Sequence, residues 1–418
     1  MTTRRQSTLA YLLIVTLTVA CLLVVRVSEE VIWRPRPLSD EATGRHLRIF
    51  TELWEIVDDD YLDPDHSGVD WDGIGQEYRA RVEAGLSDEE FWAAMDEMLL
   101  KLGDDHSIFL SPAEVAEEEQ MRTGELDYVG IGVYTAAMPE KGYAVILAVL
   151  PDSPADRAGL HPHDRILTVE GTPACCDAAG NDSLARLFGP EGSRVGLRVQ
   201  TPGEAVRAVT VTRARVQGTL PVEVRRLEGD IGYVLIPSFW DETVVEQVHQ
   251  ALEDLAAGGK LAGLILDNRV NAGGSETVLR ELLALFADGE MGHFVGRGGA
   301  EPLHVKGVDV CGSQRVPLAI LVGRETASFA EVFSGVLQET SRARIVGRTT
   351  IGNIEIVYGY DFEDGSRAWI AQETFVPPGG TDWEETGIVP DVEIPLDWDE
   401  FTAEDDPQLE AALDLLHP

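Results

Sequence analysis

The spacing of apolar residues changes along the chain and divides it into three main regions. Across residues 41–119, apolar positions recur every three or four residues, which predicts amphipathic helices. Across 128–215, short alternating runs are bounded by Gly and Pro, which predicts a β-rich module. From residue 232 to 347, apolar runs of strand length alternate with helical patterns, which predicts a mainly parallel sheet covered by helices. The predicted fold class is therefore α/β and multidomain.

The helical region contains two clear apolar faces. They are formed by Leu47, Phe50, Leu53, Trp54 and Val57, and by Phe91, Met95, Met98, Leu99 and Leu102. Ser87 followed by three acidic residues is typical of a helix start, and Gly103 ends the second pattern. We expect residues 104–112, which include His106, to form a loop.

The later regions contain most of the strand candidates. In the β-rich module these are residues 130–135, 144–149, 165–169, 195–200 and 208–213. In the α/β region we expect strands at 232–239, 263–267, 317–322 and 345–347, and helices at 243–257, 276–286 and 329–339. A turn in the β-rich module holds His161 and His163, which we expect to be solvated. A last helix near Pro407–Leu416 is expected to dock the C-terminus.

A long apolar stretch near the N-terminus predicts a membrane segment. Residues 9–25 are apolar apart from Thr and Tyr, and Arg4 and Arg5 precede them. The length suits a short span, and the preceding positive charge orients the N-terminus to the cytoplasm. We expect a signal anchor that leaves the rest of the chain extracytoplasmic, in the periplasm or at the cell surface. The alternative is a secreted protein after signal cleavage.

Charge and cysteine content exclude several classes of partner. The net charge of −40 would repel nucleic-acid phosphates and anionic lipid headgroups, and its ordinary meaning is a solvated acidic surface. The cysteines are Cys21, Cys175, Cys176 and Cys311, and no Cys/His spacing is typical of a zinc site. We therefore expect no metal, no cofactor and no structural disulfide, although a bridge from Cys311 to Cys175 or Cys176 stays open.

A serine at the start of a predicted helix is the first candidate for chemistry. Ser328 follows the apolar run 316–322 and a short polar turn, and the helix 329–339 comes next. Helix N-termini carry free N–H groups and partial positive charge. A serine there can act as a nucleophile with oxyanion donors already near its substrate, although an ordinary helix cap has the same pattern.

A glycine pair is expected at the same edge of the sheet. Gly273 and Gly274 follow the strand 263–267, and the carboxyl ends of parallel strands are where open α/β sheets place their sites. The N–H groups of both glycines, together with that of Phe329, could stabilise a developing oxyanion. Taken alone, the pair is also compatible with a plain turn.

The β-rich module resembles a PDZ domain. The matching residues are Tyr128-Val129-Gly130-Ile131-Gly132-Val133, Ser153-Pro154-Ala155, Ala158-Gly159-Leu160 and Asp164-Arg165-Ile166. In that family the loop of Gly130, Ile131, Gly132 and Val133 offers backbone N–H groups to the C-terminal carboxylate of a peptide, which adds as a strand. The resemblance implies binding of apolar C-terminal tails. The plain alternative is a tight turn without a ligand.

The whole arrangement resembles the C-terminal processing peptidases, or tail-specific proteases, of the tricorn-core serine peptidase clan. The family motifs are D-x-R-x-N-x-G-G at residues 267–274, S/T-A-S-x-x-E at 326–331 and G-I-x-P-D at 387–391. The helical region, the inserted module and the α/β region occur in the family's order. The resemblance covers roughly residues 40–395 and implies that Ser328 is the nucleophile of a serine endopeptidase, with Glu331 as a structural residue.

One departure from the family pattern changes the expected mechanism. Members with a Ser-Lys dyad carry the base in T-F-G-K-G-x-V-Q, but here Asn353 replaces the lysine and Val357 replaces the glutamine. An Asn side chain cannot accept a proton near neutral pH. Tricorn-like members use a histidine from a comparable loop, so the resemblance makes His106 the candidate base. Candidates to orient its ring are Asp104, Asp105, Glu384 and Glu385.

Together, these patterns predict how the whole chain is divided into parts. The expected parts are a cytoplasmic stub and membrane anchor at 1–28, a linker at 29–40, a helical cap at 41–125, a PDZ domain at 126–216, a serine peptidase core at 217–396 and a C-terminal helix at 397–418. The expected function is endoproteolysis of proteins near PDZ-bound apolar tails through an acyl-enzyme. The alternative is an inactive homologue that binds peptides or scaffolds partners, which the missing lysine favours.

Overall fold

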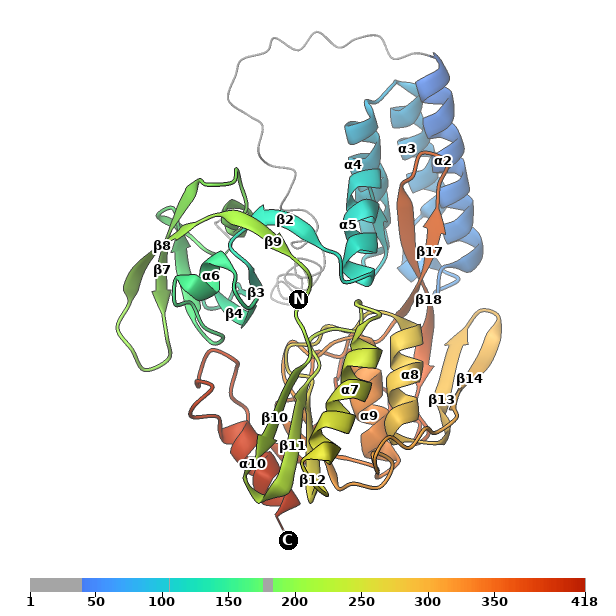
Figure 1. Ribbon diagram of the computed structural model, residues 1–418. Coiled ribbons are helices and arrows are strands. Elements are labelled where there is room, and N and C mark those ends of the chain that lie inside the picture. Colours follow the sequence, from blue (N-terminus) through green and yellow to red (C-terminus); the bar gives the residue numbers. More distant parts are fainter. Residues whose placement is uncertain (1–39, 105, 176–182, 418) are drawn as a thin grey trace.

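The computed structural model describes residues 40–104, 106–175 and 183–417. Figure 1 shows a helical region above, a β-rich module to one side and an α/β region below. The predicted anchor and nearly all of the predicted linker lie outside the described residues. Within those residues, no helix combines the length and the apolar character needed to cross a membrane.

The helical region follows its apolar pattern. Its helices are α2 (Asp40–Asp60), α3 (Trp71–Glu83), α4 (Asp88–Leu99) and α5 (Pro112–Arg122). The two predicted faces meet in one buried cluster, in which Phe50 and Leu53 of α2 join Met95 of α4. Ser87 caps α4 through a reciprocal pair of hydrogen bonds with Glu90, which typically stabilises a helix by about 1 kcal/mol. The predicted start of this helix is confirmed.

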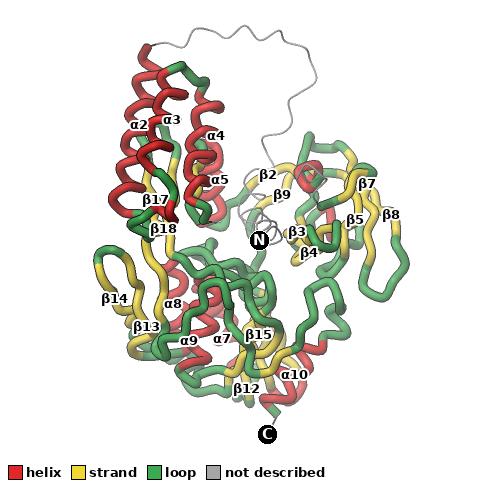
Figure 2. The backbone as a smooth tube through the Cα atoms, turned by 180° about the vertical axis from the view of Figure 1, so that it is seen from behind, coloured by secondary structure: helices red, strands yellow, loops and turns green. Residues whose placement is uncertain are grey.

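The loop predicted at 104–112 is partly wrong, because it contains a strand. β1 (Ile108–Leu110) pairs antiparallel with β18 (Arg367–Val376), a strand from far along the chain. The same sheet contains β13 (Gly289–Gly296), β14 (Gly299–Val305) and β17 (Ile356–Asp361), which the sequence did not predict. The β17–β18 hairpin runs alongside the helices in Figures 1 and 2 and contributes Ala368 and Ile370 to their core.

The β-rich module is built from short antiparallel strands. They are β2 (Asp127–Gly130), β3 (Val133–Met138), β4 (Tyr143–Val149), β5 (Arg165–Val169), β6 (Thr172–Pro173), β7 (Arg194–Gln200), β8 (Arg207–Thr212) and β9 (Ala214–Gln217), with the short helix α6 (Pro154–Arg157). The first predicted strand breaks at Gly132, whose φ of +82° favours glycine. A Cβ there would meet the Ser153 Cβ at 2.3 Å, so the turn requires glycine for space as well.

The α/β region has a central sheet in the order β10-β11-β12-β15-β16-β19. These strands are Glu223–Leu227, Ile231–Leu235, Gly263–Asp267, Leu318–Val322, Arg344–Gly347 and Val392–Glu393. All neighbours from β11 to β19 are parallel, and β10 is antiparallel to β11. Parallel strands place their carboxyl ends together, so the loops after β12 and β15 meet at one edge.

Helices cover both faces of this sheet. Leu264, Leu266 and Ile320 pack with α7 (Val244–Ala257), α8 (Glu276–Phe286) and α9 (Phe329–Glu339). The alternate residues, such as Ile265 and Leu321, pack with α10 (Pro407–Leu416) on the opposite face. Consecutive side chains of a strand point to opposite faces, which explains why these strands are apolar throughout. The predicted last helix is confirmed.

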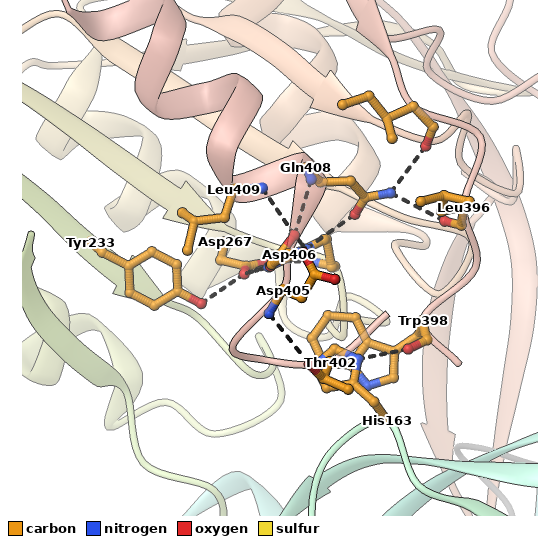
Figure 3. Close-up of polar contacts among 12 residues, drawn as sticks. His163, Tyr233, Asp267, Leu396, Trp398, Thr402, Asp405, Asp406, Gln408 and Leu409 are labelled. Atoms are coloured by element: carbon orange, nitrogen blue, oxygen red, sulfur yellow. Dashed lines mark hydrogen bonds and ion pairs between the residues drawn. The ribbon is translucent and has the colours of Figure 1, made fainter. Parts of the chain in front are cut away.

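The segment between β19 and α10 connects the sheet to the β-rich module. Trp398 Nε1 donates a hydrogen bond of 3.1 Å to the Ile146 carbonyl, and His163 Nδ1 lies 2.6 Å from the Trp398 carbonyl oxygen. The centroids of the two stacked rings lie 4.1 Å apart, and both residues are labelled in Figure 3. The prediction that His163 is solvated is wrong, since this residue is only 3% exposed. Its burial against Trp398 lowers its pKa.

The same segment supports the loop after β12, residues 268–274, which is called the Gly-rich loop below. Arg269 pairs with Asp267 at 2.6 Å and with Asp406 at 2.8 Å, all three being buried. Figure 3 shows Tyr233 and Asp406 on opposite sides of Asp267, and the Tyr233 hydroxyl donates to the Asp267 carboxylate at 2.7 Å. Removing one member of such a group would leave a buried charge without its partner, so this network fixes the start of the loop.

Candidate active site

Ser328 lies at the junction of β15 and α9, as the sequence predicted. Its backbone has φ 53° and ψ −131°, a conformation that is strained for a residue with a side chain. Its N–H group donates to the Asn353 carbonyl at 2.7 Å and to the Glu331 carboxylate at 3.1 Å. These two hydrogen bonds hold the strained turn. Ser328 lines a cavity of about 390 Å³ beneath the helical region.

Glu331 joins the nucleophile turn to the loop before β17. Its fully buried carboxylate accepts hydrogen bonds from Thr350 Oγ1, the Gly352 N–H and the Asn353 N–H, besides that of Ser328. Burial raises the pKa of Glu331 to about 7, while these donors act in the opposite direction. The geometry agrees with the structural role expected for this residue.

The Gly-rich loop touches the nucleophile directly. The Asn271 carbonyl accepts the Ala327 N–H at 3.2 Å. Gly273 has a φ of +88°, and a Cβ at this position would meet the Ser328 Cβ at 2.7 Å. However, the Gly273 N–H already donates to Asn271 Oδ1 at 2.9 Å. Gly273 therefore provides close approach to the serine, and its N–H is not free to serve as an oxyanion donor in this conformation.

The other two predicted oxyanion donors remain available. Gly274 and Phe329 line the cavity together with Ser328. Within the described residues, neither of their N–H groups donates a hydrogen bond. Gly274 also lies so close to the Phe239 backbone that a Cβ would meet it at 2.2 Å, which explains the glycine. Two unpaired N–H groups beside a serine can stabilise negative charge on a carbonyl oxygen.

His106 lines the same cavity as Ser328. Its side chain is 10% exposed, and Nε2 lies 3.5 Å from Glu355 Oε2. Burial lowers the pKa of His106 to about 4, and the charge of Asp104 only partly opposes this effect. The ring is therefore neutral at pH 7, which is the form that accepts a proton. Among the described residues, no hydrogen bond joins the Ser328 hydroxyl to this ring.

The acidic residues near His106 have different roles. The Asp104 carboxylate accepts the N–H groups of His106 and Ser107 and thereby shapes the loop backbone. Asp105 lies outside the described residues. His106, Glu355 and Glu384 place a ring nitrogen and two carboxylate oxygens within 4.8 Å of one another. Glu384 is among the carboxylates that the sequence made candidates for orienting His106, whereas Glu355 is not.

Glu385 and Asn353 complete the loops near this group. The Glu385 N–H donates to the Gly352 carbonyl at 2.8 Å, which joins the two loops through their backbones. Asn353, which replaces the lysine of the Ser-Lys pattern, lines the cavity, and so does Val357. Glu355 lies two positions after Asn353. That proximity to the lysine position is the one sequence signal that could have identified Glu355.

The remaining walls of the cavity are mainly apolar. Trp240, Trp369 and Met121 contribute to them, so the walls suit an apolar peptide segment. Two arginines, Arg122 and Arg367, also line the cavity. Both are ion-paired, since each contacts Glu119, with further contacts to Glu242 and Glu118 respectively.

The predicted peptide-binding loop borders a second, smaller cavity of about 60 Å³. Ile131, Gly132 and Val133 line it, whereas Gly130 lies in β2 and pairs with Ala214 of β9. The opposite wall includes Pro237 and Val270 of the α/β region. Because Val270 belongs to the Gly-rich loop, an occupant of this cavity would touch the loop that supports the nucleophile.

A strained serine at a helix N-terminus, beside N–H groups that donate no hydrogen bond among the described residues, is typical of serine hydrolases that act through an acyl-enzyme. Comparison with known families identifies the family of serine hydrolases that this chain matches. Residues 230–394 match peptidase family S41, and residues 46–100 match the tricorn protease C1 domain.

Curated relatives extend this match over most of the chain. A carboxyl-terminal-processing protease of Synechocystis sp. is 30% identical over 378 residues, which cover 88% of this chain and 86% of that protein. The chloroplastic carboxyl-terminal-processing peptidase 2 of Arabidopsis thaliana is 30% identical over 90% of this chain and 74% of its own. The chain belongs to peptidase family S41 and is a serine peptidase.

Solved structures agree with this assignment. The photosystem II D1 C-terminal processing protease is 26% identical, with a TM-score of 0.62 over 84% of this chain and 93% of that one. The tricorn protease is 19% identical, with a TM-score of 0.52 over 91% of this chain and 37% of that one, and shares the fold. The mixed α/β multidomain fold expected from the sequence is thus confirmed.

Proposed function

We propose that Ser328 and His106 hydrolyse peptide bonds in protein C-terminal regions by a Ser-His mechanism. One observation carries the proposal: the serine and the imidazole come from distant parts of the chain and line one cavity. Asn353 supports it as well, because its carboxamide has no basic nitrogen to replace the missing lysine.

The steps follow from the groups around the cavity. Ser328 Oγ attacks the scissile carbonyl carbon while the neutral His106 ring accepts the hydroxyl proton. The oxyanion forms against the N–H groups of Gly274 and Phe329, each such donor lowering the barrier by about 3 kcal/mol. His106 then donates its proton to the leaving amine, and an acyl-enzyme remains. A water molecule, deprotonated by His106, hydrolyses this ester and restores the serine.

The carboxylates of Glu355 and Glu384 are the proposed orienting groups. A negative charge beside the ring stabilises the imidazolium that forms during the attack, as the aspartate does in a Ser-His-Asp triad. The 3.5 Å distance from Nε2 to Glu355 supports this role. The Ile354 N–H donates to Glu384 Oε2 at 2.9 Å, which holds the second carboxylate in place. The ring would approach the serine on substrate binding, since catalytic hydrogen bonds are often long in unliganded enzymes.

The β-rich module is proposed to act as a PDZ domain that captures apolar C-terminal tails. Its support is the turn at Ile131 and Gly132, whose cavity is lined by Leu184, Leu187 and Phe188. A tail carboxylate at this turn would place the preceding chain next to Val270, in the same loop as Gly274 of the active-site cavity. The chain is further proposed to be anchored by residues 9–25 and to act outside the cytoplasm, which rests on its sequence pattern alone.

A pair of matched peptides tests both parts of this proposal. One peptide ends in an apolar residue with a free carboxylate, and the other is the same peptide with an amidated C-terminus. We expect wild-type protein to cleave the free peptide with the lower KM, and Ser328→Ala to cleave neither. Equal KM values would contradict tail capture. Tight binding of the free peptide without any cleavage by wild-type protein would instead support the inactive scaffold.

A further inference from the structure

Three side chains from distant segments form a group with the composition of a metal site. His106 lies in the loop before β1, Glu355 precedes β17, and Glu384 lies in the loop before Gly387. Their ligand atoms all lie within 4.8 Å of one another. Zinc bonds to nitrogen and oxygen are about 2.0–2.2 Å long, so tetrahedral neighbours lie roughly 3.4 Å apart. The 3.5 Å between His106 Nε2 and Glu355 Oε2 is already at this spacing.

The histidine itself points to a ligand. Its side chain is nine-tenths buried and borders the open cavity, and its Nε2 faces the Glu355 carboxylate at 3.5 Å, longer than a hydrogen bond. Glu384 is also held in place, because its Oε2 accepts the Ile354 N–H at 2.9 Å. Such support of a ligand by a neighbouring backbone group is typical of metal sites.

Charge in the cavity also permits a dication. At the position where the family resemblance places a lysine, this chain has the neutral Asn353, which lines the cavity. An ammonium group there would repel a dication, and its absence removes that repulsion. The two arginines of the same cavity are each paired with glutamates, through the contacts of Arg122 with Glu242 and of Arg367 with Glu118.

We propose that a zinc-class divalent ion binds His106, Glu355 and Glu384 and reversibly inhibits the peptidase by occupying the imidazole. One nitrogen and two carboxylate oxygens, with water as a fourth ligand, suit Zn²⁺, whereas Mg²⁺ and Ca²⁺ favour all-oxygen sites. The inhibitory effect rests on the proposed role of His106 as base. The binding itself depends only on the three side chains.

The first test measures binding without any catalysis. Metal-free Ser328→Ala protein, prepared by chelation, is titrated with Co²⁺ and followed by its visible absorption, and Zn²⁺ is then added as competitor. We expect one saturable four-coordinate site that zinc displaces. Adding Glu384→Gln or Glu355→Gln, which keep the side-chain shape, should weaken binding at least about tenfold. No saturable site, or equal binding in the Gln variants, would overturn the proposal.

A matched control is available on α7. His249 and Glu253 form an exposed His–Glu pair at 3.8 Å, and no third ligand joins them among the described residues. His249→Ala in the Ser328→Ala background should leave the cobalt site unchanged, and loss of the signal would place the ion on the surface instead.

The second test measures inhibition of wild-type protein, in which Ser328 is present. Peptide cleavage should decrease when Zn²⁺ is added and recover when a chelator is added. The same concentration of Mg²⁺ should leave cleavage unchanged. Cleavage that Zn²⁺ leaves unchanged while the cobalt site is filled would overturn the inhibitory role. If His106→Ala kept full activity, the proposed base would fail, whereas the binding result would stand independently.

Discussion

The two sides of the active-site cavity are built in opposite ways. On the nucleophile side, backbone N–H groups of Ser328 and the Gly-rich loop donate hydrogen bonds to carbonyl and side-chain oxygens in or near the sequence motifs. On the base side, His106, Glu355 and Glu384 converge from three segments, and His106 meets Glu355 and Glu384 through its side chain. The nucleophile side is thus held largely through its backbone, and the base side is a cluster of side chains. Only the nucleophile side is recognisable as a sequence motif.

This difference suggests that local contacts position the nucleophile side, whereas pairing between distant segments positions the base side. The β1–β18 pairing brings the loop of His106 to the loops that carry the two glutamates. We therefore expect substitution to have the largest effect at the serine and smaller effects at the base and its neighbours.

The largest effect is expected at the nucleophile. Ser328→Ala should lower kcat by at least about 10⁴-fold, because no acyl-enzyme can form. The measurement is cleavage of an unfolded, casein-like substrate, with circular dichroism to check the fold. Ser275→Ala is the matched control, since this serine also lines the cavity but caps α8 through the Thr277 N–H. Full activity of the Ser328 variant would show that the nucleophile lies elsewhere.

The next largest effect is expected at the base. His106→Ala should reduce kcat by about 10³-fold, in the range that general-base catalysis supplies. KM should change little, because binding of the tail does not involve this ring. Steady-state kinetics on a peptide substrate would measure both. An unchanged kcat would mean that the side-chain cluster is not the base side at all.

Glu331→Gln should break the link between the two loops on the nucleophile side. The amide group offers an N–H₂ where the carboxylate accepts hydrogen bonds, so at least one buried donor loses its acceptor. We expect a loss of about 2 kcal/mol in the free energy of unfolding, measured with urea. The exposed Glu281→Gln on α8 should change it by a few tenths at most. Equal effects of both variants would refute the role of Glu331 as a link.

The pH dependence of kcat/KM tests the protonation of the proposed base, His106. Burial lowers the pKa of His106 to about 4, so the neutral, active form persists well below the ordinary histidine range. As pH falls, kcat/KM should therefore stay near its plateau through pH 6 and decline only below it. Measuring kcat/KM from acidic to neutral pH on one peptide checks this. A midpoint near or above 7 would indicate a different base.

The smallest effect is expected at the position of the missing lysine. Asn353 contributes to the site through its backbone, whose carbonyl accepts the Ser328 N–H and whose N–H donates to Glu331. Asn353→Ala keeps both groups, so kcat should stay within about threefold of wild type. A large loss, measured in the same kinetic assay, would reveal a catalytic task for the carboxamide.

Much of the fold could be predicted because it depends on local patterns. The apolar faces of α2 and α4, the cap at Ser87 and the strand-turn-helix at Ser328 are all short-range features. The sheet of β1, β13, β14, β17 and β18 could not be predicted in the same way, because its strands pair with distant segments. His163 was assigned to a solvated turn because the Trp398 that buries it lies far along the chain.

The same reasoning explains the site. Ser328, Gly274 and Phe329 stand in motifs whose chemistry is readable from one segment. Gly273 was expected to donate to the oxyanion, but its N–H is used by Asn271, which only three-dimensional geometry reveals. Glu355 was missed because its segment shows that it lies near the lysine position but does not show that it meets His106.

The most direct test of the central claim is fluorophosphonate labelling of Ser328, followed by mass spectrometry of the labelled peptide. In the proposed mechanism, an imidazole from the helical region activates this hydroxyl. We predict rapid labelling of wild-type and Asn353→Ala protein, and a loss of labelling in folded His106→Ala protein. Labelling of His106→Ala at the wild-type rate would contradict the account.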